Sequence, residues 1–160
     1  MRLVLYEPKI EDLWFREQML VDPATMSYNE RWGGTISFPT EKWAAWYETW
    51  FDGEGERFYR YLLDEERGQF VGEVSYHLDD DGRYLCDVIV FAEYRGRGYG
   101  GAGLDMLCDA ACENDVNVLY DEIAAGNSSL AMFLSHGFEE VAKSENGTIV
   151  RKILGTESNR

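Results

Sequence analysis

Val88-Ile89-Val90-Phe91-Ala92-Glu93-Tyr94-Arg95-Gly96-Arg97-Gly98-Tyr99-Gly100-Gly101 is the stretch of this 160-residue chain that decides the fold. The apolar run at its start predicts a strand. Because that run does not alternate with polar residues, we expect the strand to be buried on both faces. A glycine-rich turn follows, and apolar residues then recur at helical spacing, at Leu104, Leu107, Cys108, Ala111 and Cys112. The stretch therefore predicts a strand, a turn and an amphipathic helix.

The turn between this strand and helix has the composition of an anion-binding loop. Glycines let a backbone approach a ligand closely, and the first turn of a helix adds about half a positive charge. Arg95 and Arg97 contribute two cations to a chain whose formal net charge is −15. A plain turn does not require this many glycines and arginines, so we expect a ligand that carries phosphate.

Two nucleotide-binding motifs share part of the loop's spacing. A Walker A loop needs a lysine and a hydroxyl after its last glycine, and here Ala102 and Gly103 follow Gly101. Gly96 and Gly98, with Gly101, match the dinucleotide fingerprint G-x-G-x-x-G, and two acidic residues follow about 20 residues later. A dinucleotide fold, however, continues through several parallel βα units. The antiparallel strands predicted before the loop, and the short chain after it, argue against that fold.

In the register Arg95-x-x-Gly98-x-Gly100 the loop resembles the [Q/R]-x-x-G-x-[G/A] signature of the GNAT superfamily, the acyl-CoA-dependent N-acyltransferases. Residues 127–138, Asn-Ser-Ser-Leu-Ala-Met-Phe-Leu-Ser-His-Gly-Phe, resemble the family's Asn-capped helix that ends in Gly-Phe. The resemblance implies an α/β (α+β) fold, with a mixed, mostly antiparallel twisted sheet flanked by helices and a splayed central strand pair. We expect one such domain over residues 1–155 and a polar C-terminal tail over residues 156–160.

The remaining elements follow from hydrophobic periodicity and turn residues. A helix that begins near Thr40 carries large aromatic residues at i, i+3, i+4, i+7 and i+8, which predict either a face packed on the sheet or a wall of a substrate pocket. Residues 22–38 read as an irregular segment. The expected strands are Leu3–Tyr6, Phe58–Leu63, Gln69–Leu78, Tyr84–Phe91, Val116–Tyr120, Phe138–Ala142 and Thr148–Ile153.

The resemblance implies coenzyme A as the phosphate-bearing ligand and acetyl-CoA as the co-substrate. Loop N–H groups would bind the pyrophosphate, and the preceding strand would pair with the pantetheine arm. One strand N–H would also polarise the thioester carbonyl. The implied cofactor-binding residues are Val88, Val90, Arg95, Gly96, Arg97, Gly98, Tyr99, Gly100, Gly101, Asn127 and Phe133.

Direct attack of an amine on acetyl-CoA needs a base that takes a proton from the incoming ammonium. Asp87 is the first candidate, because a carboxylate that opens a buried apolar strand costs free energy unless it is paired or useful. Glu73 lies among apolar residues of the neighbouring strand and is the second candidate. Glu122 is the third, and it is also a candidate for holding a cationic acceptor. His77 and Asp121 are further local candidates.

The acid that protonates the departing thiolate is missing from its family position. The resemblance implies a tyrosine there, and this chain has Phe133. Tyr99 and Tyr120 are conceivable replacements. The substitution keeps open a second hypothesis, in which the domain is a catalytically weak or inactive acyl-CoA-binding module that acts as a sensor or interaction domain.

Charge and composition narrow the partners. Fifteen Lys and Arg face thirty Asp and Glu, a balance that disfavours nucleic acid and anionic membranes and permits a cationic amine, either a small molecule or a peptide. Three cysteines without a C-x-x-C pair, and two isolated histidines, predict neither a disulfide framework nor a metal site. The chain has no signal-like or membrane-spanning run, so we expect a cytoplasmic protein. The family resemblance also makes a homodimer plausible.

Overall fold

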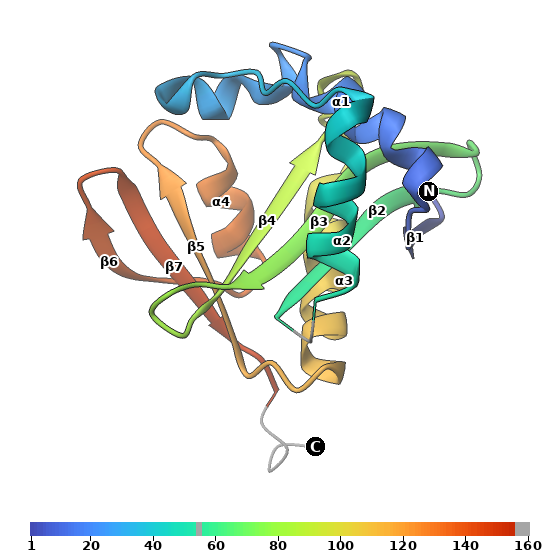
Figure 1. Ribbon diagram of the computed structural model, residues 1–160. Coiled ribbons are helices and arrows are strands. Elements are labelled where there is room, and N and C mark those ends of the chain that lie inside the picture. Colours follow the sequence, from blue (N-terminus) through green and yellow to red (C-terminus); the bar gives the residue numbers. More distant parts are fainter. Residues whose placement is uncertain (54–55, 156–160) are drawn as a thin grey trace.

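The computed structural model describes residues 1–53 and 56–155, and the predicted tail at residues 156–160 lies outside them. Within the described residues, seven strands form one twisted sheet in the order β1-β2-β3-β4-β5-β7-β6 (Figure 1). Only β4 and β5 are parallel neighbours, and every other pair is antiparallel. The strands are β1 (Leu3–Tyr6), β2 (Arg57–Asp64), β3 (Gln69–Leu78), β4 (Tyr84–Val90), β5 (Val118–Ala124), β6 (Glu139–Ser144) and β7 (Gly147–Ile153).

Helices cover both faces of this sheet (Figure 1). One face carries α1 (Trp14–Leu20) and α2 (Trp43–Phe51), and the other carries α3 (Tyr99–Glu113) and α4 (Ser129–Ser135). Short 3₁₀ turns connect them: η1 (Ile10–Leu13), η2 (Thr25–Trp32), η3 (Thr40–Lys42) and η4 (Ala92–Tyr94). No helix of the described residues has both the length and the apolar character that crossing a membrane requires. The predicted mixed, mostly antiparallel sheet flanked by helices is confirmed.

Strand alternation sends two sets of side chains into two separate cores. Tyr59 and Tyr61 of β2 are buried with Ile89 of β4 beneath α1 and α2. Residues of the same strands that point the opposite way, such as Leu62 of β2 and Cys86 of β4, are buried beneath α3. The sheet is therefore apolar on both faces over its central strands.

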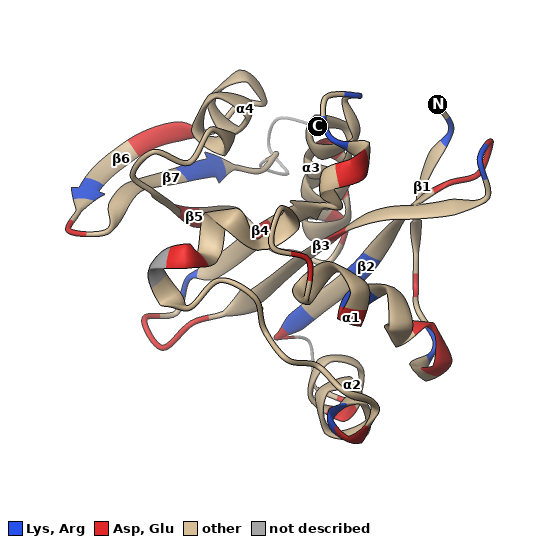
Figure 2. Cartoon of the chain, turned by 90° about the horizontal axis from the view of Figure 1, so that it is seen from above, with Lys and Arg blue, Asp and Glu red and all other residues tan. Residues whose placement is uncertain are grey.

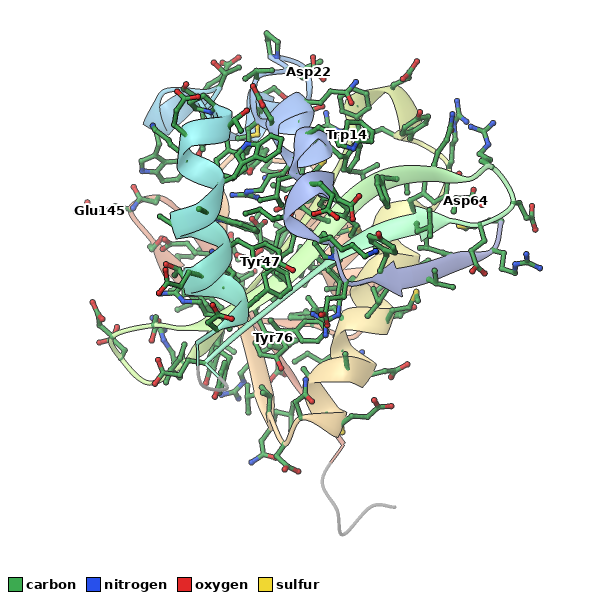
Figure 3. All side chains as sticks on the ribbon, turned by 45° about the vertical axis from the view of Figure 1, so that its right-hand side comes forward. Trp14, Asp22, Tyr47, Asp64, Tyr76 and Glu145 are labelled. Atoms are coloured by element: carbon green, nitrogen blue, oxygen red, sulfur yellow. The ribbon has the colours of Figure 1, made fainter. Side chains whose placement is uncertain are left out.

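The aromatic residues of α2 belong to the packing of the first face. The Trp46 ring meets the buried Tyr59 ring edge to face, with centroids 4.8 Å apart, and the hydroxyl of Tyr47, which Figure 3 labels, donates a hydrogen bond to the carbonyl of Pro8. No described residue of α2 lines the large cavity of the molecule. Of the two interpretations of this helix, the structure supports the face packed on the sheet, and the pocket wall is wrong.

The central strand pair is splayed. The pairs Tyr84–Leu119 and Leu85–Tyr120 join β4 to β5, and the two strands then diverge. Val88 and Val90 consequently lose a neighbour on one side and are half-buried. The expectation that this strand is buried on both faces is therefore wrong for these two side chains, because sequence alone does not show where a neighbouring strand departs.

Other boundaries differ for local reasons. The strand expected at Val116–Tyr120 runs instead over Val118–Ala124, because the N–H of Val116 bonds to the carbonyl of Ala111 and so completes the end of α3. The penultimate strand starts at Glu139 and extends to Ser144. The segment expected to be irregular contains η2.

Gly72 of β3 tests how tightly β3 and β4 approach. A Cβ at this position would lie 2.3 Å from the carbonyl oxygen of Ile89 and 3.1 Å from the Cα of Val90. Backbone atoms cannot move away cheaply, so Gly72→Ala is expected to reduce the free energy of unfolding by about 2–3 kcal/mol. Urea denaturation measures this change.

Gly103 of α3 is a matched control. A Cβ there would lie 2.7 Å from a terminal methyl of Leu62, which a rotamer change can displace. In a helix interior, alanine is also more favourable than glycine by about 1 kcal/mol. Gly103→Ala should therefore cost clearly less than Gly72→Ala, and equal losses would contradict the backbone-clash argument.

Candidate functional site

A cleft of about 1020 Å³ opens where β4 and β5 separate. Its walls come from β4, the loop before α3, β5, α4 and η2. In Figure 1 the η2 segment lies across the end of the molecule above β5 and α4. Elements distant in sequence thus meet at one cavity, which is the size expected of a site for a small organic ligand.

The loop at one end of the cleft has the backbone of an anion site. Gly96 and Gly98 have φ values of 78° and 87°, a left-handed conformation that favours glycine. Gly98 directly precedes α3, so the unpaired N–H groups of the helix's first turn belong to this loop. Gly100 also permits close packing, since a Cβ there would lie 3.0 Å from the sulfur of Met132. The loop can therefore hold phosphate through backbone groups.

The two arginines of the loop differ in position. The Arg95 guanidinium donates hydrogen bonds to the carbonyls of Ala24 and Thr25, at 3.1 and 2.8 Å. The Arg97 guanidinium lies over the ring of Tyr94, 5.7 Å from its centroid, and the side chain is exposed. Both side chains are exposed, but Arg95 lines the cleft with its guanidinium bonded to protein carbonyls, whereas Arg97 does not line it.

Tyr99, at the start of α3, lines the cleft and is bonded to the end of β2. Its buried hydroxyl donates a hydrogen bond to Oδ2 of Asp64 at 2.5 Å, and Figure 3 labels Asp64 at the far end of β2. This bond, together with desolvation, raises the pKa of Tyr99. Tyr120 is the other candidate for the acid that protonates the thiolate. Its ring lies beneath the guanidinium of Arg83 and does not line the cleft.

Three carboxylates of the splayed strands line the cleft: Asp87 of β4, and Asp121 and Glu122 of β5. Water reaches Asp87 through the cleft, but the surrounding protein partly desolvates it, and this with the charge of Glu73 raises the pKa of Asp87 to about 7. Burial and then the charge of Asp87 raise the pKa of Asp121 well above its ordinary range. Figure 2 shows acidic segments on these central strands as well as on the outer loops.

Glu73 lies outside the cleft, on the face beneath α1 and α2. Its carboxylate accepts two hydrogen bonds from Arg16, at 2.8 and 3.1 Å, and one from the hydroxyl of Tyr59. Desolvation alone would lower the pKa of Arg16, but the Glu73 carboxylate raises it. The Arg16 guanidinium also stacks on Trp46 at 4.5 Å. Glu73 is therefore the buried ion-pair partner of Arg16, and it does not line the cavity.

The opposite wall carries the residues of the Asn…Gly-Phe block. Asn127 lines the cleft, and its side-chain oxygen accepts the N–H of Ser129 at 2.9 Å. Phe133 also lines it, buried, with its ring edge against Phe138 at 4.9 Å. Across the gap, Val88 and Val90 of β4 line the same cleft.

Sequence reasoning missed several lining residues. Tyr28 and Trp32 come from the segment that was expected to be irregular. The pKa of Tyr28 is raised by burial and then by the charge of Asp87. His136 bonds Asp105 at 2.9 Å and fills the space beside Gly101. Its position just before the Gly-Phe pair is a signal that could have found it. Among the described residues no group of three or more His, Cys, Asp and Glu could hold a metal.

The fold, the splay and the glycine loop together define an acyltransferase-like cleft. The model of the Acetyltransferase (GNAT) family matches residues 18–138. The chain therefore belongs to the GNAT acetyltransferase family. No curated protein gives a significant match.

Solved structures share the fold over nearly the whole chain. A ribosomal-protein-alanine N-acetyltransferase from Brucella melitensis is 27% identical, with a TM-score of 0.74, covering 94% of this chain and 99% of the other. A spermidine N-acetyltransferase from Vibrio cholerae in complex with CoA and spermine is 16% identical (TM-score 0.79, 96% of each chain). A phosphinothricin acetyltransferase from Sinorhizobium meliloti in complex with AcCoA is 18% identical (TM-score 0.76, 97% and 90%).

The buried Arg16–Glu73 pair predicts a large, asymmetric effect on stability. Arg16→Met leaves the Glu73 carboxylate buried without its cation, so the free energy of unfolding should fall by about 3–5 kcal/mol. The double variant Arg16→Met/Glu73→Gln removes both charges and should recover most of that loss. Urea denaturation at pH 7 compares the two, and equal losses would show that the effect is packing rather than charge.

Proposed function

We propose that the chain transfers the acetyl group of acetyl-CoA to a primary amine of a cationic acceptor. One observation carries this proposal: the same cleft is lined by an anion-binding loop, which follows β4, and by a group of carboxylates on β4 and β5. The loop suits the pyrophosphate of coenzyme A, and the carboxylates suit an ammonium. Membership of the GNAT family and the CoA and AcCoA complexes of fold neighbours support the choice of cofactor.

In this proposal the cofactor lies along the gap that the splay leaves. The N–H groups of residues 95–101 bind the pyrophosphate, and the exposed edge of β4 at Val88 and Val90 pairs with the pantetheine arm. Asn127 and Phe133 border the pantetheine arm on its other side. The N–H of Val90 polarises the thioester carbonyl.

Asp87 is the proposed general base. It lines the cleft, and its pKa of about 7 makes a substantial fraction of it both ionised and basic at neutral pH. The amine nitrogen gives a proton to Asp87 and attacks the thioester carbon. The C–S bond then breaks, the nitrogen gives its second proton to solvent, and the departing thiolate takes up a proton from solvent. Asp121 and Glu122 attract the cationic acceptor, and the rings of Tyr28 and Trp32 border the same cavity.

Asp87→Asn is expected to lower kcat/KM for the amine by about 100-fold or more, because the base is lost. In the wild type, Asp87 is protonated below its raised pKa, so kcat/KM should rise as pH increases through about 7. The rise should be absent from the variant. Initial rates of thiol release from acetyl-CoA, measured from about pH 5.5 to about pH 8.5 so that the range includes that pKa, report both effects.

Glu73→Gln is the comparison variant for this experiment. Glu73 does not line the cleft, so its loss should move the inflection to lower pH, through the missing charge beside Asp87, without abolishing turnover. If both variants keep wild-type rates and profiles, neither carboxylate is the base.

The first test of the whole proposal is binding. Acetyl-CoA and CoA should each raise the melting temperature. A ligand concentration of about 100 times Kd adds about 2.7 kcal/mol to the free energy of unfolding. NAD and NADP should leave it unchanged. The absence of stabilisation by either form of coenzyme A would reject the proposal.

A second candidate function, an acyl-CoA-binding module without catalysis, is favoured by one observation. The buried Phe133 provides no proton at the position where the family resemblance implies an acid. Thiol release across a panel of amines separates the two functions. Coenzyme A binding with no amine-dependent release above background would support the module.

A further inference from the structure

The η2 segment is attached to the phosphate loop through the guanidinium of Arg95. This side chain donates one hydrogen bond to the carbonyl of Ala24 and another to that of Thr25, at 3.1 and 2.8 Å. Both acceptors lie at the start of η2 (Thr25–Trp32). The bonds span about 70 residues of sequence, so local chain structure does not provide them.

A second connection joins the same two segments. The side-chain oxygen of Thr25, which is fully buried, accepts the N–H of Ala92 at 2.9 Å and donates to Oδ2 of Asp22 at 2.5 Å. Figure 3 labels Asp22 at the top of the molecule, where the chain enters η2. Ala92 begins the η4 turn, and the carbonyl of Ala92 accepts a hydrogen bond from the N–H of Arg95. The end of β4 and the start of η2 therefore form one bonded unit.

Both ends of this unit face the same cleft. Arg95, Gly96 and Gly98 line it on the loop side. On the η2 side the lining residues are Ser27, Tyr28 and Trp32. The carbonyls of Ala24 and Thr25 lie immediately before the η2 residues that reach the cavity. Arg95 is therefore bonded to the segment whose following residues line the cleft.

We propose that Arg95 is a positioning residue for the acceptor side of the cleft, holding η2 in place through the carbonyls of Ala24 and Thr25 rather than contacting phosphate itself. The division between a cofactor side and an acceptor side rests on the proposed function. Two hydrogen bonds from one charged guanidinium, together with the bonds of the Thr25 side chain, restrain the start of this short 3₁₀ segment. Arg97 remains available as the cation of the loop.

Hydrogen–deuterium exchange on the free full-length chain tests the positioning role. Arg95→Met should speed exchange of η2 amides by about 10-fold, because local opening of the segment becomes easier. Thr25→Val removes the second connection and should give the same local effect. Arg97→Met is the matched control and should leave η2 within about twofold of wild type. Wild-type exchange in η2 of Arg95→Met would overturn the proposal.

Kinetics add a readout that a general loss of stability would not move. Arg95→Met should raise KM for the amine about 10-fold, while Kd for acetyl-CoA, measured by calorimetry, stays within about threefold of wild type. Arg95→Lys keeps the charge with a single donor head and should restore part of the loss. A variant that weakens acetyl-CoA binding and leaves KM for the amine unchanged would make Arg95 a phosphate ligand and reject the proposal. If no variant turns over any amine, the proposed function fails, and the exchange data still decide the role of Arg95.

Discussion

The loss of backbone pairing between β4 and β5 is the constraint on which the rest of the structure depends. Two residue pairs hold these parallel strands together, and beyond Leu85 and Tyr120 they separate. An open strand edge inside a sheet leaves N–H and C=O groups without partners, which is costly unless water or a ligand satisfies them. The cleft follows from this separation, and the anion loop beyond β4 and the carboxylates of both strands line it.

Glu73 and Asp87 lie on the same face of the central strands, yet one is paired within the protein and the other opens to the cleft. Beneath α1 and α2, the Glu73 carboxylate is bonded by Arg16 and Tyr59 and forms a buried ion pair. At the splay, Asp87 has a raised pKa partly because Glu73 lies diagonally across the β3–β4 ladder, where Glu73 pairs with Ile89 and Asp87 with Ser75. The buried ion pair thus contributes to the electrostatics of the cleft without touching it.

The sequence predicts the fold well because its strongest signals are local. The glycine loop, the meander and the Asn…Gly-Phe block each depend on neighbours in sequence, and each lies where it was expected. The half-buried state of Val88 and Val90 was not predictable, because it depends on a strand thirty residues later that departs from them.

The site was predictable to a lesser extent. Loop residues Gly96 to Gly101 and the carboxylates Asp87 and Glu122 line the cleft as a local pattern indicates, apart from Arg97, which projects from the loop. Glu73 looked equivalent to Asp87 in sequence and lies on the same face of the sheet, but the distant Arg16 and Tyr59 bind it outside the cleft. Tyr28 and Trp32 carry no motif, and only tertiary packing brings η2 to the cavity.

The contact between Gly101 and His136 has a consequence for how this family member can diverge. The imidazole lies where a side chain at residue 101 would be, with its Nε2 2.4 Å from the position of a Cβ. The ring is held there by Asp105, one turn further along the same helix. A larger residue at 101 therefore requires this imidazole to move, and a smaller residue at 136 would make the space. Positions 101 and 136 should accordingly vary as a pair among descendants of this chain, although 34 residues of sequence separate them.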